Sequence, residues 1–183
     1  MKNIKHFVYV FDLDNTLIKT NKANNISYRE AVKTVVGIDL EMSRNSRFTR
    51  RKLADVLPNL KTEEARQIVA LKEQLFQKYL SITILNKNLF QILTLLSRSE
   101  EVMLLTDSRE NRAKQLLDYY NLELLFLKRY YHENLSGLNK YQFLENTLGI
   151  DKTQVVLFEN DFAEKNRAAK NGILLNQIIK VKF

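Results

Sequence analysis

The chain contains no cysteine and only two histidines, and both scarcities limit its chemistry. Without cysteine the chain cannot form a disulfide, a thiolate zinc site or a cysteine nucleophile. The two histidines, His6 and His132, leave few ways to build a Ser/His/Asp triad or a site with several imidazole ligands. A catalytic metal would therefore depend on oxygen ligands, and hard oxygen ligands favour Mg²⁺.

Glycine, proline and long hydrophobic runs are also scarce. Four glycines and one proline are too few for a linker-rich or low-complexity chain. The first apolar run, residues 7–11, follows two lysines and a histidine but is too short for a signal peptide or a membrane span. We therefore expect a cytoplasmic protein that is not attached to a membrane. A chain of 183 residues with 45% hydrophobic residues suffices for one ordinary domain with a small insertion.

Short apolar segments alternate with helical patterns along most of the chain. The expected strands are residues 7–11, 102–105, 124–131, 155–158 and 173–175. The expected helices between them are residues 88–97, 109–120, 139–148 and 164–171. Alternation of strands and helices predicts an α/β fold, in which right-handed βαβ units build a Rossmann-like parallel sheet with helices on both faces.

Residues 19–83 interrupt this alternation, because the stretch shows helical patterns and no convincing strand. Its clearest helix begins at Thr62, with two glutamates in the first turn where they suit the helix dipole. An earlier helix is expected at residues 27–36, before a glycine. We predict a small all-helical subdomain at residues 19–83, inserted after the first strand into an α/β core formed by residues 1–18 and 84–183.

Polar side chains follow three of the expected strands at the point where each strand ends. Ligands of open α/β sheets bind at the carboxyl ends of the strands, so these residues are the first candidates for a site. They are Asp12, Asp14 and Thr16 after the first strand, Thr106, Asp107 and Ser108 after the second, and Glu159, Asn160 and Asp161 after the fourth. Lys140 begins the helix that leads into the fourth strand.

These residue types suit phosphoryl chemistry. Asp12 and Asp14 are separated by one residue, so they can share one divalent cation and would repel each other without it. With the cation and Lys140 cancelling negative charge, a phosphate dianion can approach a carboxylate. The hydroxyl of Thr106 could then donate a hydrogen bond to a phosphoryl oxygen.

Four motifs stand at these positions. Residues 11–17 are FDLDNTL, residues 104–108 are LLTDS, and Lys140 precedes residues 155–172, VVLFENDFAEKNRAAKNG. In this order they resemble the DxDxT signature, the second motif, the third-motif lysine and the fourth motif of the haloacid dehalogenase-like hydrolases. The resemblance covers the chain outside the insert, and it implies an Mg²⁺-dependent phosphatase that hydrolyses a small phosphate monoester.

The resemblance also implies roles for individual residues. Asp12 would attack phosphorus and form a phospho-aspartyl intermediate. Asp14 would protonate the leaving oxygen and then activate water, and its backbone carbonyl would bind Mg²⁺. Thr106 and Lys140 would hold the phosphoryl group, and Thr16 would support the nucleophile.

Two residues beside the second motif have simpler alternative roles. Asp107 either contributes to phosphate binding or caps the following helix. Arg109 is interpreted as a surface residue, because arginine is mostly exposed in folded proteins.

The fourth motif departs from the family pattern. Counting back from Gly172, Glu159 and Asn160 stand where family members carry Asp-Asp, Gly-Asp or Glu-Asp. An amide oxygen can ligate Mg²⁺ but brings no charge, so Asn160 should weaken the metal affinity unless Glu159 or Asp161 compensates. The expected metal ligands are Asp12, Asp14, Asn160 and Glu159. The alternative is a weakly active or non-catalytic phosphate-binding protein of the same fold.

The insert is similar to the family's C1-type helical cap, which closes over the active site and selects the substrate. Residues 19–83 contain 13 Lys and Arg against seven Asp and Glu, so they hold most of the net charge of +8.

The densest basic cluster comprises Arg44, Arg47, Arg50, Arg51 and Lys52. Facing the cleft, it would favour a multiply anionic metabolite such as a nucleotide or sugar phosphate. Facing outward, it would be a solvated helix face. Nucleic acid is a less favoured partner because no recognisable binding module accompanies the charge.

Two other activities use similar residues. Response-regulator receivers also combine acidic residues on a first strand with a threonine and a lysine, but their phosphorylated Asp lies on a later strand. Dehalogenases of the same superfamily lack an acid at the position of Asp14, which a phosphatase needs to protonate an alkoxide leaving group. Asp12, Asp14 and Thr16 therefore favour a phosphatase over both.

Overall fold

The computed structural model describes residues 6–42 and 46–183 and divides into two units. The insert unit comprises Lys19–Ile84, and the core unit comprises Met1–Ile18 together with Leu85–Phe183. These boundaries lie within one residue of the ones expected from the sequence. Each unit has its own hydrophobic core.

The core unit contains a five-stranded parallel sheet with the strand order β5-β4-β1-β6-β7. The strands are β1 (Val8–Phe11), β4 (Glu101–Leu105), β5 (Lys128–Tyr130), β6 (Val155–Glu159) and β7 (Ile178–Lys180). Phe11 at the end of β1 is in register with Leu104 of β4 and Phe158 of β6. Because the strands are parallel, their carboxyl ends meet at one edge of the sheet. The predicted α/β fold with a Rossmann-like sheet is confirmed.

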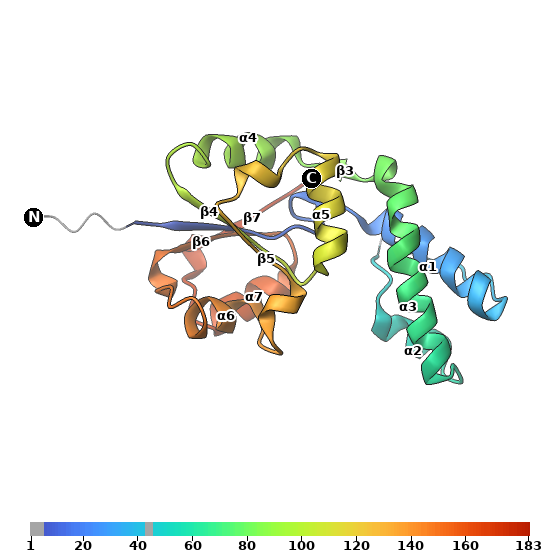
Figure 1. Cartoon of the computed structure of the whole chain (residues 1–183). Helices are drawn as coiled ribbons and strands as arrows, with labels where there is room; N and C mark the ends of the chain where they lie inside the picture. The colour runs from blue at the N-terminus through green and yellow to red at the C-terminus, as the bar shows by residue number, and fades with distance from the viewer. Residues whose placement is uncertain (1–5, 43–45) are drawn as a thin grey trace, which may run out of the picture. The chain divides into compact units, whose positions relative to one another are not determined.

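Helices cover both faces of this sheet. Helices α4 (Lys87–Leu96) and α5 (Glu110–Tyr119) lie on one face, and α6 (Lys140–Asn146) and α7 (Phe162–Lys170) lie on the other (Figure 1). Short 3₁₀ helices complete the connections: η2 (Glu123–Leu125), η3 (His132–Leu135), η4 (Lys152–Gln154) and η5 (Leu175–Gln177). In the described part of the chain, no helix has both the length and the apolar character that crossing a membrane requires.

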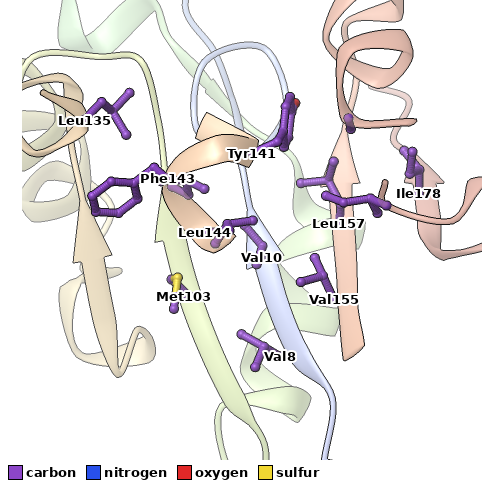
Figure 2. Packing of buried hydrophobic residues seen from close by; sticks show 13 residues of the cluster. Val8, Val10, Met103, Leu135, Tyr141, Phe143, Leu144, Val155, Leu157 and Ile178 are labelled. Carbon is purple, nitrogen blue, oxygen red and sulfur yellow. The ribbon is translucent and has the colours of Figure 1, made fainter. Parts of the chain in front are cut away.

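Alternate residues of the strands build the core on the α6 and α7 face. Figure 2 shows this cluster, which joins side chains of β1, β4 and β6 to those of α6; it includes Val8, Val10, Met103, Leu105, Val155, Leu157, Tyr141, Phe143 and Leu144. On the other face of the sheet, the ring of Phe11 stacks on Phe158 with centroids 4.3 Å apart. The central strands are therefore buried on both faces. This packing holds the strand ends in place, and the candidate site residues follow directly after those ends.

The insert unit is built from helices, as predicted. They are α1 (Asn21–Val36), α2 (Arg50–Val56), α3 (Thr62–Phe76) and η1 (Gln77–Ile82). Helix α1 begins six residues earlier than expected, because the side chains of Asn24 and Asn25 in its first turns bind the backbone of Phe48. It ends at Gly37, whose φ of 73° places it in the left-handed region that favours glycine.

Two short strands lie at the two places where the chain passes from one unit to the other. Strands β2 (Ile18–Lys19) and β3 (Ile84–Leu85) form a separate two-stranded sheet. The backbone N–H of Asn86 also donates to the carbonyl of Leu17, with 2.9 Å between the atoms. Neither strand was predicted from the sequence, because two residues are too few to show a periodicity.

Two predicted strands differ from the structure. The third, expected at residues 124–131, is limited to β5 because the 3₁₀ helix η2 occupies its first part. The prediction of a strand at residues 173–175 was wrong, since β7 begins at Ile178. Leu174 and Leu175 are exposed, and η5 carries the chain from α7 to the edge of the sheet.

Candidate active site

The polar residues that follow β1, β4 and β6 lie at the carboxyl edge of the sheet. The N–H of Asp12 donates to the carbonyl of Phe158 on β6, and the N–H of Thr106 donates to the carbonyl of Tyr130 on β5. These bonds continue the strand pairing past the last strand residues, so the positions of the first polar residues are fixed by the sheet itself.

A tight turn follows β1 and holds the loop that contains Asp14. The backbone N–H groups of Thr16, Leu17 and Ile18 all lie within 3.4 Å of the carbonyl oxygen of Leu13. Asn15 has a φ of 61°, a left-handed conformation that asparagine tolerates better than most residues. Leu13 and Leu17 are fully buried and anchor the turn in the core unit.

Lys140 lies among three carboxylates. Its Nζ is 3.0 Å from Oδ1 of Asp12, 3.1 Å from Oε2 of Glu159 and 4.0 Å from Oε2 of Glu164. Its side chain is only 4% exposed. Burial alone would lower the pKa of Lys140, but Asp12 and Glu159 raise it well above its ordinary value. Lys140 is therefore a permanent cation in the site.

The carboxyl group of Asp12 loses its proton less readily than an ordinary aspartate, because its pKa is raised. Burial raises the pKa of its carboxyl group to about 7, and the attraction of Lys140 offsets only part of this effect. The nearby carboxylates of Glu159 and Asp14 raise the pKa further. A divalent cation next to Asp12 would favour the ionised form that a nucleophile requires.

Glu159 and Thr16 connect the loop after β1 to the end of β6. The hydroxyl of Thr16 donates to Oε1 of Glu159 over 3.4 Å and accepts from the N–H of Asn160 over 3.2 Å. Oε1 of Glu159 also accepts from the N–H of Asp161, while Oε2 contacts Lys140. Glu159 is thus engaged through both oxygens, and the structure supports a role in holding Lys140 and the loop.

Asn160 and its neighbours offer oxygen donors that fit Mg²⁺. The Nδ2 of Asn160 donates to the carbonyl of Asn15 over 2.9 Å, which leaves Oδ1 at the opposite side of the amide. Among residues 6–42 and 46–183, no three His, Asp or Glu side chains gather as a metal cluster. A cation here would therefore rely on the carboxylate of Asp12, the backbone carbonyl of Asp14 and the amide oxygen of Asn160. These are hard donors, and their low total charge predicts modest affinity.

Thr106 is buried and partly engaged. Its Oγ1 accepts from the N–H of Ser108 over 3.1 Å, so the hydroxyl hydrogen can still be donated elsewhere. Asp107 is exposed and does not cap α5, whose N-cap residue is Arg109. The helix-cap alternative for Asp107 was therefore wrong, while its carboxylate still contributes to the raised pKa of Lys140. Arg109 is exposed, as interpreted from the sequence.

Sequence reasoning missed Arg112. This residue lies on the buried face of α5 and is 8% exposed. Its Nη2 is 2.7 Å from Oδ2 of Asp14 and 2.5 Å from Oγ of Ser108, and the hydroxyl of Ser108 donates to the same oxygen of Asp14. An arginine four residues after Ser108, next to buried apolar positions of an amphipathic helix, was the signal that could have revealed it.

The basic cluster of the insert unit is partly engaged within that unit. The guanidinium of Arg47 donates to the hydroxyl of Thr20 over 3.0 Å, and Nζ of Lys52 donates to the carbonyl of Arg47 over 3.0 Å. Arg50 and Arg51 are exposed in the first turn of α2. Arg44, which was also predicted to belong to this cluster, lies outside the described residues.

A comparison with protein-family models gave no match, and neither did a comparison with curated proteins. Solved structures did match. CbbY from Rhodobacter sphaeroides, in complex with phosphate, is 16% identical over 91% of this chain and 82% of its own, with a TM-score of 0.74. A haloacid dehalogenase-like family hydrolase from Streptococcus pneumoniae is 15% identical over 92% and 82%, with a TM-score of 0.73. A subfamily IA hydrolase of the same superfamily from Geobacter sulfurreducens is 13% identical over 92% and 85%, with a TM-score of 0.66.

At these identities the likeness shows the fold. The chain has the fold of the haloacid dehalogenase-like hydrolases, as its motifs led us to expect. The match extends over about nine tenths of the chain, so it includes most of the insert as well as the core.

Proposed function

We propose that the chain is a phosphatase that hydrolyses a small phosphate monoester in the presence of Mg²⁺, through a phospho-aspartyl intermediate on Asp12. The observation that carries the proposal is the contact of Asp12 with Lys140 at the carboxyl edge of the sheet. This contact joins a buried carboxylate to a buried cation across 128 residues of sequence, at the edge where ligands of such sheets bind. The order of the four motifs and the fold of the solved relatives support the same activity.

The first step would transfer the phosphoryl group to the protein. A carboxylate oxygen of Asp12 forms a bond to phosphorus while the bond from phosphorus to the ester oxygen breaks. The departing oxygen takes its electron pair and receives a proton from Asp14. Lys140 and the hydroxyl of Thr106 would hold the phosphoryl oxygens, whose charge they stabilise during transfer.

The second step would release the phosphate. A water molecule attacks phosphorus and gives a proton to Asp14, and the bond from phosphorus to Asp12 breaks. Inorganic phosphate leaves, and both aspartates return to their starting states. Thr16 and Glu159 would support this cycle by fixing the loop after β1 and holding Lys140 in place.

A bound Mg²⁺ would neutralise charge between Asp12 and the phosphoryl group, so that two anions can approach each other. Asp12, the backbone carbonyl of Asp14 and the amide oxygen of Asn160 would hold it. Glu159, a predicted ligand, fits a supporting position better, because Lys140, Thr16 and the N–H of Asp161 already contact its oxygens.

The insert unit would act as a C1-type cap that selects the substrate. We propose a multiply anionic, phosphorylated metabolite of the nucleotide or sugar phosphate class, recognised in the cytoplasm through Arg44, Arg47, Arg50 and Arg51. The support is the excess of positive charge in residues 19–83, together with the absence of any opposing acid between Arg44 and Lys52.

Replacement of Asp12 tests the proposal. Wild type should release nitrophenol from 4-nitrophenyl phosphate when Mg²⁺ is present, and a chelator should stop the reaction. Asp12→Asn should lower the rate by at least about a thousandfold, because an amide cannot form the intermediate. Circular dichroism should show an unchanged fold, since Lys140 keeps its contact with Glu159.

The matched control is Asp118→Asn, the same chemical change at an exposed position of α5. It should leave the rate unchanged. Equal rates for wild type and Asp12→Asn would refute the nucleophile. Acid-quenched samples of wild type should also contain a phosphorylated peptide that includes Asp12.

A second candidate function follows from Asn160. The amide of Asn160 brings no charge to the metal site. In this second candidate function, the chain binds phosphate groups and hydrolyses phosphate esters weakly or not at all. The same experiment separates the two functions. Phosphate binding by calorimetry without nitrophenol release from wild type would favour the non-catalytic protein.

A further inference from the structure

Arg112 is a buried charge that the proposed reaction does not yet use. Its side chain is 9% exposed, and the Asp14 carboxylate that it contacts is 14% exposed. Burying a guanidinium is costly, and an apolar residue of similar volume often stabilises a core equally well. A contribution to stability alone therefore does not account for an arginine at this position.

Arg112 and Ser108 both donate to one carboxylate oxygen of Asp14, the proposed acid and base. Nη2 of Arg112 lies 2.7 Å from Oδ2 of Asp14, and Oγ of Ser108 donates to that same Oδ2. Arg112 also donates to Oγ of Ser108, so the three side chains form a closed triangle. Two donors on one carboxylate oxygen restrict the rotation of the Asp14 side chain.

Rigid elements hold both donors of this triangle. The N–H of Ser108 donates to Thr106, and its carbonyl accepts from the N–H of His132 over 3.0 Å. Arg112 follows one turn later on α5, beside Ala113 and Leu116, which are fully buried. A site carried by buried helix and strand ends is held more closely than one carried by loops.

We propose that Arg112 and Ser108 are positioning residues that fix the Asp14 carboxylate for proton transfer to and from the ester oxygen. This inference rests on the proposed phosphatase function, and it adds that side chains at the start of α5 orient Asp14 in the loop after β1. Neither residue touches the phosphoryl group in this role. Each acts only through Asp14.

A leaving-group comparison tests the inference. Phenyl phosphate and 4-nitrophenyl phosphate have similar shapes, but phenol is the poorer leaving group and needs a positioned acid. In the first turnover, Arg112→Met should slow release of phenol by about 100-fold, because misplacement of a catalytic group costs about this much. Release of nitrophenol should fall by less than about threefold, since it needs little protonation.

A double-mutant cycle separates positioning from a structural role. In an Asp14→Asn background, Arg112→Met should cause no further loss with either ester, because its effect passes through Asp14. Ser108→Ala should give the same selective pattern with about a tenfold loss of phenol release, and it keeps the protein testable if Arg112→Met folds poorly. Arg112→Lys should restore part of the phenol release. Arg109→Met, a change at the exposed arginine three residues earlier, is the matched control and should have no effect.

The outcomes distinguish this inference from the proposed function. Suppose that wild type releases both phenol and nitrophenol. The positioning role is then wrong, and the phosphatase function stands, if Arg112→Met slows both releases equally. The same holds if Arg112→Met further slows the Asp14→Asn protein. If wild type releases neither alcohol, the proposed function fails and the positioning role fails with it.

Discussion

At the scale of single residues, the site is short of positive charge. Asp12, Glu159 and Glu164 all lie within 4.0 Å of one ammonium group, that of Lys140. Burial, the largest cause, raises the pKa of Asp12 to about 7. The proton on Asp12 and a divalent cation should therefore compete for the same carboxylate.

This competition predicts a pH-dependent affinity for Mg²⁺. At a pH below the pKa of Asp12, which is about 7, most molecules carry a proton on Asp12 that must leave before the metal binds. At a higher pH, most molecules have already lost this proton. Affinity should therefore rise with pH and be about tenfold weaker near about pH 6 than near about pH 8. Calorimetry of chelator-treated protein would measure this. Repeating the titration in two buffers should show proton release at the lower pH only. Equal affinities without proton release would contradict the role of Asp12.

At the scale of elements, a short helix determines where Lys140 lies. Helix α6 has only seven residues, and Lys140 is the first of them. The side chain of Asn139 accepts from the N–H groups of Tyr141 and Gln142, both over 3.0 Å. The amide of Gln142 accepts from the N–H of Asn139 in return and completes a capping box. The cap holds the first turn and so supports the contact between Lys140 and Asp12.

Asn139→Ala should weaken both stability and activity. Loss of this cap should cost about 1 kcal/mol of unfolding free energy, measured by urea titration. Turnover of 4-nitrophenyl phosphate should fall by about tenfold, because fraying of the first turn displaces Nζ of Lys140. Asn146→Ala, at the exposed last residue of α6, is the control and should change neither quantity appreciably. An unchanged rate in a destabilised Asn139→Ala protein would show that the cap does not position Lys140.

At the scale of the whole molecule, one chain forms two compact units. A hydrophobic cluster in the core unit packs the sheet against α6 and α7, and a cluster in the insert unit packs α1, α2 and α3 together. Inside the core unit, the bond from the N–H of Asn86 to the carbonyl of Leu17 brings the two ends of the insertion point together. The insertion point can therefore be closed by a short linker.

A variant in which a Gly-Ser linker replaces residues 19–84 should fold. It should hydrolyse 4-nitrophenyl phosphate within about tenfold of wild type, because the proposed catalytic residues all belong to the core unit. It should lose any preference among phosphorylated metabolites in a substrate screen, since lids commonly supply selectivity. The same variant with Asp12→Asn is the blank. If the linker variant keeps the substrate preference of wild type, the insert does not select the substrate.

The sequence by itself predicted the three central strands, the helical insert and the candidate site residues Asp12, Thr106 and Lys140. It could do so because strand ends and helix starts are local features, and apolar segments followed by acids mark them directly. Only the tertiary structure decided three other features: the contact of Arg112 with Asp14, the contact of Glu159 with Lys140, and the start of β7 at Ile178. Each depends on which distant side chain or sheet edge lies within a few ångströms, and packing sets those distances while local spacing does not.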